Sequence, residues 1–156
     1  MFDRTIALIG QDNLDKIESK HILIIGVGGV GGYAIEALIR SGIHNITLVD
    51  YDNIDISNIN RQIIAKESNV GKLKVEAWKE RINEINSSVL VNTLPLKIDE
   101  NNIDILFKIS YDYIIDACDT VIVKKLLIKK CHEKNIKLIT VCGMGKKLNP
   151  SLVKIC

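Results

Sequence analysis

The sequence predicts an α/β protein: a doubly wound, mainly parallel sheet with helices on both faces, preceded by short N-terminal helices. Three observations lead to this fold class. Residues 21–25 form a continuous apolar run, which is typical of a strand buried on both faces. A glycine-rich stretch follows at once and opens a segment with helical apolar spacing. Further strand-like and helix-like segments then alternate, as they do in parallel sheets with crossover helices.

The first helix is predicted over residues 30–41, because apolar side chains recur there at helical spacing and Gly42 ends the pattern. Residues 45–50 are the second strand, and a polar, asparagine-rich segment follows over 53–60. The next helix begins near Gly71. Its apolar face includes Trp78, which this pattern places in the core.

The remaining elements continue the alternation. We predict a third strand at 89–96 closed by Pro95, a short helix at 103–109, a fourth strand at 113–117, a helix through 123–131 and a fifth strand at 136–141. The expected strand order is 3-2-1-4-5. In such sheets ligands bind beyond the carboxyl ends of the strands, where the order reverses.

The chain of 156 residues is expected to form one domain, with residues 1–20 as an N-terminal helical arm. Residues 151–156 resemble the start of another strand, so we expect a longer domain from which a C-terminal part is missing. With 47% hydrophobic residues, no apolar run long enough to span a membrane and no signal-peptide pattern, a cytoplasmic protein is expected. The cysteines show no C-x-x-C spacing and are interpreted as reduced thiols.

The net charge of +2 does not by itself indicate a nucleic-acid partner. The distribution is less even, because residues 97–119 hold six acids and two lysines, whereas residues 120–147 hold eight lysines and one glutamate. Two interpretations stay open for the basic segment: solvated helix faces, or a surface that faces a polyanion.

Residues 26–31 match the pattern G-x-G-x-x-G through Gly26, Gly28 and Gly31, with Gly29 beside them. Glycines at these positions let the backbone turn sharply and approach a phosphate, which the N-terminus of the following helix also attracts. Asp50 lies at the end of the second strand, where a carboxylate can bind ribose hydroxyls. Alone, this signal indicates a Rossmann-like nucleotide site.

The residues after Asp50 narrow the choice of nucleotide. Five segments follow one another in chain order: G-x-G-G-V-G, L-V-D-x-D, S-N-I-N-R-Q, V-G-K-x-K, and D-A-C-D-T at 116–120. With them the sequence resembles the ThiF/MoeB/HesA superfamily of ATP-dependent adenylating enzymes, which are relatives of the ubiquitin-activating enzymes. The resemblance covers essentially the whole chain. It implies that ATP, not NAD, is the nucleotide, and that Mg²⁺ accompanies it.

Two further segments are similar to one branch of that superfamily, the tRNA threonylcarbamoyladenosine dehydratases. They are F-D-R-T with L-I-G at the N-terminus, and Gly143–Pro150, which matches G-x-G-x-K-x-x-P. The sequence departs from the pattern at Gly32, where the family usually has serine. A hydroxyl near the phosphates would be lost, although the backbone contacts would survive.

Arg61 and Lys74 are the expected phosphate cations, since arginine offers a planar two-oxygen grip and lysine a point charge. Exposed surface charge is the alternative for both, and Lys72 could replace Lys74. Asp119 is the expected magnesium ligand, because one carboxylate with phosphate oxygens and waters satisfies Mg²⁺. A helix N-cap is its alternative or additional role.

Further residues lie near these motifs or at the N-terminus. Asp52 and Asn58 are expected to line the site, with a turn as the alternative for Asp52. The resemblance implies that Arg4 is an arginine finger that reaches into the partner subunit of a homodimer; a solvated terminal charge is the alternative. Cys118 adjoins Asp119, but a thiol at a strand end is more often core than nucleophile.

The combined hypothesis is ATP-dependent adenylation of a substrate carboxylate, namely dehydration of threonylcarbamoyladenosine in tRNA to its cyclic form. The lysines of 120–147, including Lys146 and Lys147, would face the tRNA backbone. Adenylation of the C-terminal glycine of a ubiquitin-like sulfur carrier, with a cysteine desulfurase system as partner, is the first alternative. A nucleotide-binding module without turnover is the second, and an NAD oxidoreductase is the third.

Overall fold

The computed structural model describes residues 1–143, 149 and 152–155. A five-stranded parallel sheet runs in the order β3-β2-β1-β4-β5, which confirms the expected order. The strands are β1 (His21–Ile25), β2 (Asn45–Val49), β3 (Leu90–Leu94), β4 (Tyr113–Asp116) and β5 (Lys137–Thr140). Each is bounded within a few residues of its expected range.

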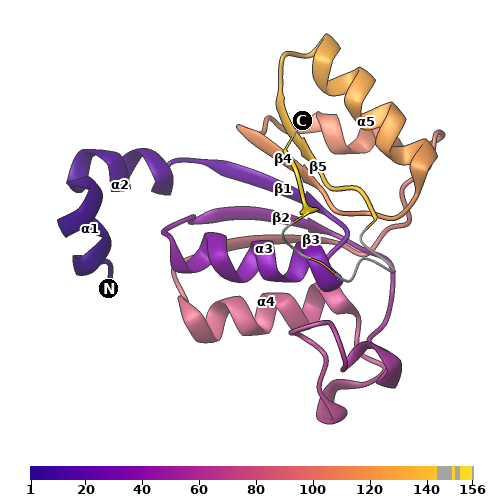
Figure 1. The fold of residues 1–156 in the computed structure, drawn as a ribbon, viewed down its shortest axis with the longest axis horizontal. Coiled ribbons are helices and arrows are strands. Elements are labelled where there is room, and N and C mark those ends of the chain that lie inside the picture. Colours follow the sequence, from indigo (N-terminus) through magenta and orange to yellow (C-terminus); the bar gives the residue numbers. More distant parts are fainter. Residues whose placement is uncertain (144–148, 150–151, 156) are drawn as a thin grey trace.

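Helices cover both faces of the sheet, as Figure 1 shows. One face carries α3 (Gly29–Arg40) and α4 (Lys74–Ile85). The other carries α5 (Val121–Glu133) and η3 (Ile103–Lys108), which is a 3-10 helix. Two further 3-10 turns, η1 (Ile56–Asn58) and η2 (Glu67–Asn69), lie in the long connection between β2 and α4.

The apolar run of β1 explains this layering. Ile22 and Ile24 belong to the core cluster under α3 and α4, whereas Leu23 and Ile25 belong to the cluster under α5 and η3. Because side chains alternate along a strand, a run without polar residues fills both layers. The central strand of the sheet is therefore buried on both faces, as the sequence predicts.

The N-terminal arm consists of α1 (Asp3–Ile9) and α2 (Gln11–Glu18) and lies at the amino ends of the strands (Figure 1). Leu14 of α2 is buried, whereas α1 buries none of its residues. The Phe2 and His44 rings are 6.3 Å apart, which fixes the arm beside the start of β2. Among the described residues, no helix is long and apolar enough to cross a membrane.

Candidate nucleotide-binding site

The glycine loop leaves β1 and opens α3 at the carboxyl edge of the sheet. Gly26 has a φ of +84°, and a Cβ there would lie 2.8 Å from the backbone of Ala117 and Cys118. A Cβ on Gly31 would lie 1.9 Å from the Gly26 oxygen. No other residue fits these two positions, so the loop is as tight as its pattern predicts.

Asp50 holds the loop in place. Its carboxylate accepts hydrogen bonds from the Val27 N–H and the Asp52 N–H, both at 2.9 Å. The aspartate therefore joins the glycine loop to the turn that follows β2. Each carboxylate oxygen keeps a lone pair for a further donor such as a ribose hydroxyl.

Arg61 comes from the turn that follows η1. The backbone carbonyl oxygen of Asn58 accepts hydrogen bonds from the backbone N–H groups of Arg61 and Gln62, at 3.1 and 2.9 Å. The Asn58 side chain is buried and accepts from the Asp55 N–H at 3.1 Å. Asn58 therefore stabilises the turn that carries Arg61. Its buried side chain makes a hydrogen bond inside this turn, so it would support the site through Arg61.

This turn rests directly on the glycine loop. A Cβ on Gly29 would lie 3.4 Å from the carbonyl oxygen of Arg61. The Arg61 side chain is exposed, and its Nη1 donates to the Ser57 oxygen at 2.7 Å and to Asn60 Oδ1 at 2.9 Å. The guanidinium is therefore held by two neutral acceptors of its own turn, and the Asp55 carboxylate interacts with it electrostatically.

Gln62 is a site residue that sequence reasoning did not assign. It is buried, and its Nε2 lies 3.4 Å from the position of a Cβ on Gly28. Its buried Oε1 has no hydrogen-bond partner among the described residues. A buried acceptor without a donor is costly. A bound ligand with a donor group would satisfy this oxygen, so the residues present fit a nucleotide. In the sequence, the position of Gln62 directly after Arg61 could have indicated its place near the loop.

Lys74 is the first residue of α4 and its side chain is 7% exposed. Its Nζ lies 2.8 Å from Asp52 Oδ2, and its backbone N–H donates to the Asp52 oxygen at 3.0 Å. Through Asp52 and Asp50, Lys74 is connected to the glycine loop by hydrogen bonds. Asp52 forms the turn after β2 through its hydrogen bond to Asp50, and its expected place in the lining of the site stays a prediction.

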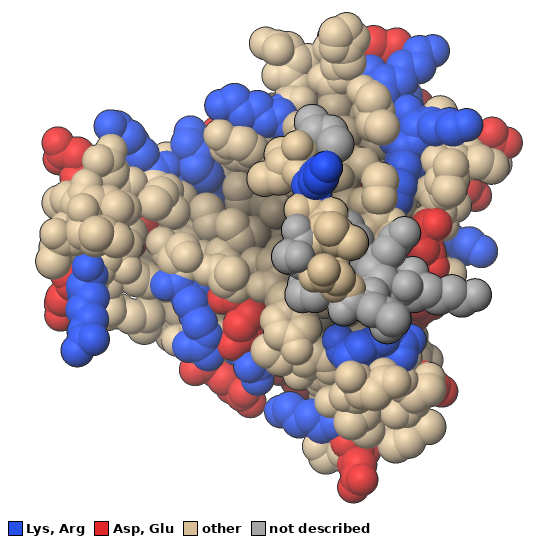
Figure 2. Space-filling view, viewed as in Figure 1, with Lys and Arg blue, Asp and Glu red and all other residues tan. Residues whose placement is uncertain are grey.

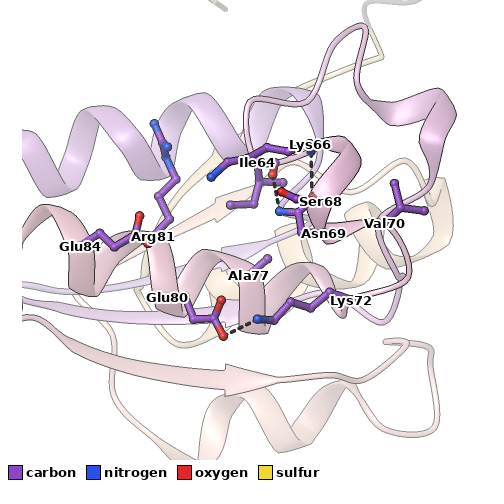
Figure 3. Close-up of a pocket in the computed structure, with 10 residues that line it drawn as sticks. All are labelled: Ile64, Lys66, Ser68, Asn69, Val70, Lys72, Ala77, Glu80, Arg81 and Glu84. Atoms are coloured by element: carbon purple, nitrogen blue, oxygen red, sulfur yellow. Dashed lines mark hydrogen bonds and ion pairs between the residues drawn. The ribbon is translucent and has the colours of Figure 1, made fainter.

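Lys72 occupies a different surface. Its Nζ pairs with Glu80 inside a cavity between the η2 segment and the outer side of α4 (Figure 3). None of the expected nucleotide-binding residues lines that cavity. Lys74, not Lys72, is the lysine connected to the glycine loop.

Asp119 directly follows the Ala117–Cys118 peptide, which packs against Gly26. It is exposed, and the Thr120 hydroxyl lies 3.4 Å from its Oδ1. The cap position of α5 is Thr120 and no side chain caps the helix, so the expected N-cap role of Asp119 is wrong. Among the described residues, no cluster of three or more His, Cys, Asp or Glu could hold a metal.

A buried ion pair supports the segment that carries Asp119. Asp116 is fully buried, and both of its oxygens accept from Lys124 Nζ at 3.1 Å. Lys124 also donates to the Val141 oxygen at 2.9 Å, and the Thr140 hydroxyl donates to Asp116 at 2.6 Å. Lys124 therefore points inward, which corrects its expected place among the RNA-facing lysines. A buried carboxylate is stable only when a cation or hydrogen-bond donors compensate its charge. The spacing of the lysines along α5 did not show that Lys124 has this role.

Cys118 is adjacent to this pair. Burial, then the neighbouring Asp116 carboxylate, raises the pKa of the Cys118 thiol to about 11. A neutral thiol is a poor nucleophile, in keeping with its interpretation as a core residue.

Arg4 is the one expected catalytic residue that lies away from the loop. It lies on α1 and lines a groove with Ile39, Arg40 and Ile85, at the C-terminal ends of α3 and α4. The glycine loop is at the other end of α3, a helix of 12 residues, or roughly 18 Å. Most of the Gly143–Pro150 segment, including Lys146 and Lys147, lies outside the described residues.

The fold and the candidate site together define a Rossmann-like α/β domain whose glycine loop lies near the Arg61 turn, the Asp50–Asp52–Lys74 hydrogen bonds and the segment that carries Asp119. The sequence pattern of the ThiF family matches residues 2–151. The chain belongs to the ThiF family.

Several members of this family are similar to the chain in sequence and in structure. The tRNA threonylcarbamoyladenosine dehydratases of Haemophilus influenzae and Bacillus subtilis are 42% and 40% identical over 95% and 99% of this chain. The crystal structure of the Escherichia coli enzyme, TcdA, in complex with ATP superposes with a TM-score of 0.93 at 39% identity and covers 96% of this chain. This chain spans 57% and 61% of the two curated relatives and 62% of the crystallised chain, or about three fifths of each.

Proposed function

We propose that this chain binds ATP at the glycine loop and uses it to adenylate the carboxylate of threonylcarbamoyladenosine in tRNA. The observation that carries the proposal is the arrangement around the loop: Arg61 rests on Gly29, and Lys74 is connected to the loop through Asp52 and Asp50. Two cations beside a phosphate-binding loop serve a triphosphate and have no role with nicotinamide. The solved relatives with ATP and with AMP support this choice.

A carboxylate does not react with a nucleophile because it has no good leaving group. Transfer of AMP to the carboxylate provides one. A carboxylate oxygen attacks the α-phosphorus of ATP, the bond from that phosphorus to the bridging oxygen breaks, and pyrophosphate leaves. The carbamoyl nitrogen then attacks the activated carbonyl carbon, loses its proton and displaces AMP. The substrate loses one water overall, and its ring closes.

The chain's own residues provide positioning and charge. Glycine-loop N–H groups and the start of α3 bind phosphate oxygens, while Arg61 and Lys74 neutralise charge that develops as pyrophosphate departs. Asp50 and Gln62 orient the nucleoside. Asp119 would hold Mg²⁺, which, when bound, neutralises phosphate charge as a Lewis acid.

The oligomer and the RNA surface are part of the same proposal. Arg4 lies too far from its own glycine loop to act there, so it serves the second site of a homodimer. Figure 2 shows basic side chains over α5, with acidic side chains among them. Lys125 and Lys129 are exposed on this helix and would contact the tRNA backbone.

Nucleoside analysis tests the proposal. The protein, together with any C-terminal part that its gene encodes, is incubated with ATP, Mg²⁺ and tRNA that carries threonylcarbamoyladenosine, and the digested nucleosides are measured by mass spectrometry. We expect a nucleoside lighter by one water, with AMP and pyrophosphate released. An unchanged nucleoside, with adenylation of a ubiquitin-like sulfur carrier, would favour that alternative; ATP binding without turnover of either would favour a non-catalytic module.

A further inference from the structure

Trp78 contacts the glycine loop from beneath. It lies on α4 with no exposed surface, and its Nε1 donates to the Val27 carbonyl oxygen at 3.1 Å. The Val27 N–H donates in turn to Asp50 Oδ2 at 2.9 Å. Val27 is itself fully buried. Its two backbone polar groups are therefore held by side chains from two different elements, which fixes the loop without any ligand.

Gly32 faces the same indole. A Cβ on Gly32 would lie 2.9 Å from Trp78 Cζ2, closer than side-chain atoms pack. The indole is rigid and fully buried, so it has no room to move aside. Serine, which the family resemblance leads one to expect at position 32, would collide with it. The departure at Gly32 is thus explained by the residue opposite.

The same helix carries a proposed phosphate cation. Lys74 begins α4, and Trp78 follows one turn later on the same side of the helix. Lys74 is anchored to Asp52, and Trp78 to Val27. Helix α4 therefore sets the distance between the glycine loop and the lysine, both of which must meet one triphosphate.

We propose that Trp78 is a positioning residue of the nucleotide site and that Gly32 is its matched partner. The inference rests on the proposed ATP binding. Trp78 holds the Val27 peptide so that the loop's N–H groups already point toward the phosphates before ATP arrives. A loop ordered in advance loses less conformational freedom on binding, and that gain appears as affinity.

Calorimetry with ATP and Mg²⁺ tests the hydrogen bond through Trp78→Phe, which removes the N–H donor and keeps a buried ring. We expect ATP affinity to fall about tenfold. Ile82→Val is the matched control, because Ile82 is equally buried on α4 and its apolar side chain donates no hydrogen bond to the loop. It should lower the melting temperature and leave ATP affinity unchanged. Wild-type affinity in Trp78→Phe would overturn the inference, whereas a wild-type protein that fails to bind ATP would overturn the proposed function instead.

A double-mutant comparison tests the pair. In the protein that keeps Trp78, Gly32→Ser should weaken ATP binding, because the new side chain displaces the indole. In the background of Trp78→Leu the same serine has room, so its effect on ATP affinity should shrink several-fold. Equal effects of Gly32→Ser in both backgrounds would overturn the pairing.

The unmodified protein offers a test that does not depend on folding of a variant. Trp78 is the single tryptophan of the chain, so its indole N–H gives one NMR signal. That signal should resist solvent exchange without nucleotide and should shift during an ATP titration with the affinity that calorimetry gives. An indole N–H that exchanges freely with solvent in the absence of nucleotide would contradict the proposal.

Discussion

At the scale of single residues, the lysines around α4 show how two similar side chains come to have different roles. Lys72 Nζ pairs with Glu80 on the outer side of α4, whereas Lys74 Nζ is buried against Asp52. Sequence spacing could not separate them, because both follow Gly71 within three positions. The separation comes from the isolated bridge between Asn53 and Leu73, which aligns Lys74 with Asp52.

Lys74→Ala and Lys72→Ala form a matched pair. We expect Lys74→Ala to weaken ATP binding roughly 10- to 100-fold, the usual effect of losing a charge-assisted contact. Lys72→Ala should leave ATP affinity within twofold. Isothermal calorimetry at one salt concentration measures both. A larger loss for Lys72→Ala than for Lys74→Ala would reverse the assignment.

The cysteines allow a second residue-scale prediction. With the pKa of the Cys118 thiol raised to about 11, this thiol is almost wholly protonated at pH 8. Cys131 is buried and its pKa is also raised by burial, whereas Cys142 is exposed. Brief treatment with iodoacetamide at pH 8 should therefore label Cys142 well before Cys118, as read by peptide mass spectrometry. Preferential labelling of Cys118 would show an activated thiol instead.

At the scale of elements, the start of β1 carries a titratable group that affects stability. His21 Nε2 lies 2.9 Å from Thr47 Oγ1, and its ring packs edge-on against Tyr111 at 4.7 Å. Burial lowers the pKa of His21, and the nearby Asp112 carboxylate offsets this only in part. The unfolded chain therefore binds more protons than the folded chain near and below the ordinary histidine pKa of about 6.5.

The free energy of unfolding should accordingly fall as the pH drops from 7.5 to 5.5. His21→Gln, which keeps a polar group for Thr47, should lose part of this slope. His132→Gln is the control, because His132 is exposed on α5 and should keep the slope. Urea unfolding at several pH values measures it. A His21→Gln protein with the full wild-type slope would assign the pH dependence to other groups.

The order of elements followed from the sequence because alternating strand and helix patterns admit few topologies. Two features did not follow. The segment 103–109 forms a 3-10 helix that is too short to show α-helical spacing. Lys124 matches the exposed lysines in charge and spacing, yet it turns inward because Asp116 is buried at the end of β4. Such pairings depend on tertiary contacts that no local pattern contains.

The candidate site was predictable to a similar degree. The glycine loop, Asp50, Arg61 and Lys74 come together as the spacing indicates. The support beneath them was not predicted: Trp78 matched an apolar helical stripe, and its hydrogen bond to the loop depends on how α4 packs against α3. An apolar pattern identifies burial but not the polar contact that a buried side chain makes.

In the whole molecule, helix α1, which carries Arg4, lies at the amino ends of the strands, whereas the glycine loop follows the carboxyl end of β1 (Figure 1). If Arg4 completes the site of a partner subunit, mixing two inactive proteins should restore activity. Arg4→Ala and Arg61→Ala subunits would form mixed dimers in which one site carries both lesions and the other carries neither. Assays after subunit exchange should recover activity in the mixture. No recovery despite demonstrated exchange would place Arg4 outside the partner's site.

ATP binding by the glycine loop and Arg61 underlies every step of the proposed reaction. Calorimetric titration of the wild-type chain and of Arg61→Ala, each with ATP–Mg²⁺ and with NAD, tests it most directly. Arg61 is exposed, so its loss should leave the melting temperature nearly unchanged. We expect the wild-type chain to bind ATP–Mg²⁺ more tightly than NAD, and Arg61→Ala to lower ATP affinity at least tenfold. Tighter binding of NAD, or ATP binding unaffected by Arg61→Ala, would show that this site is not an ATP site built around Arg61.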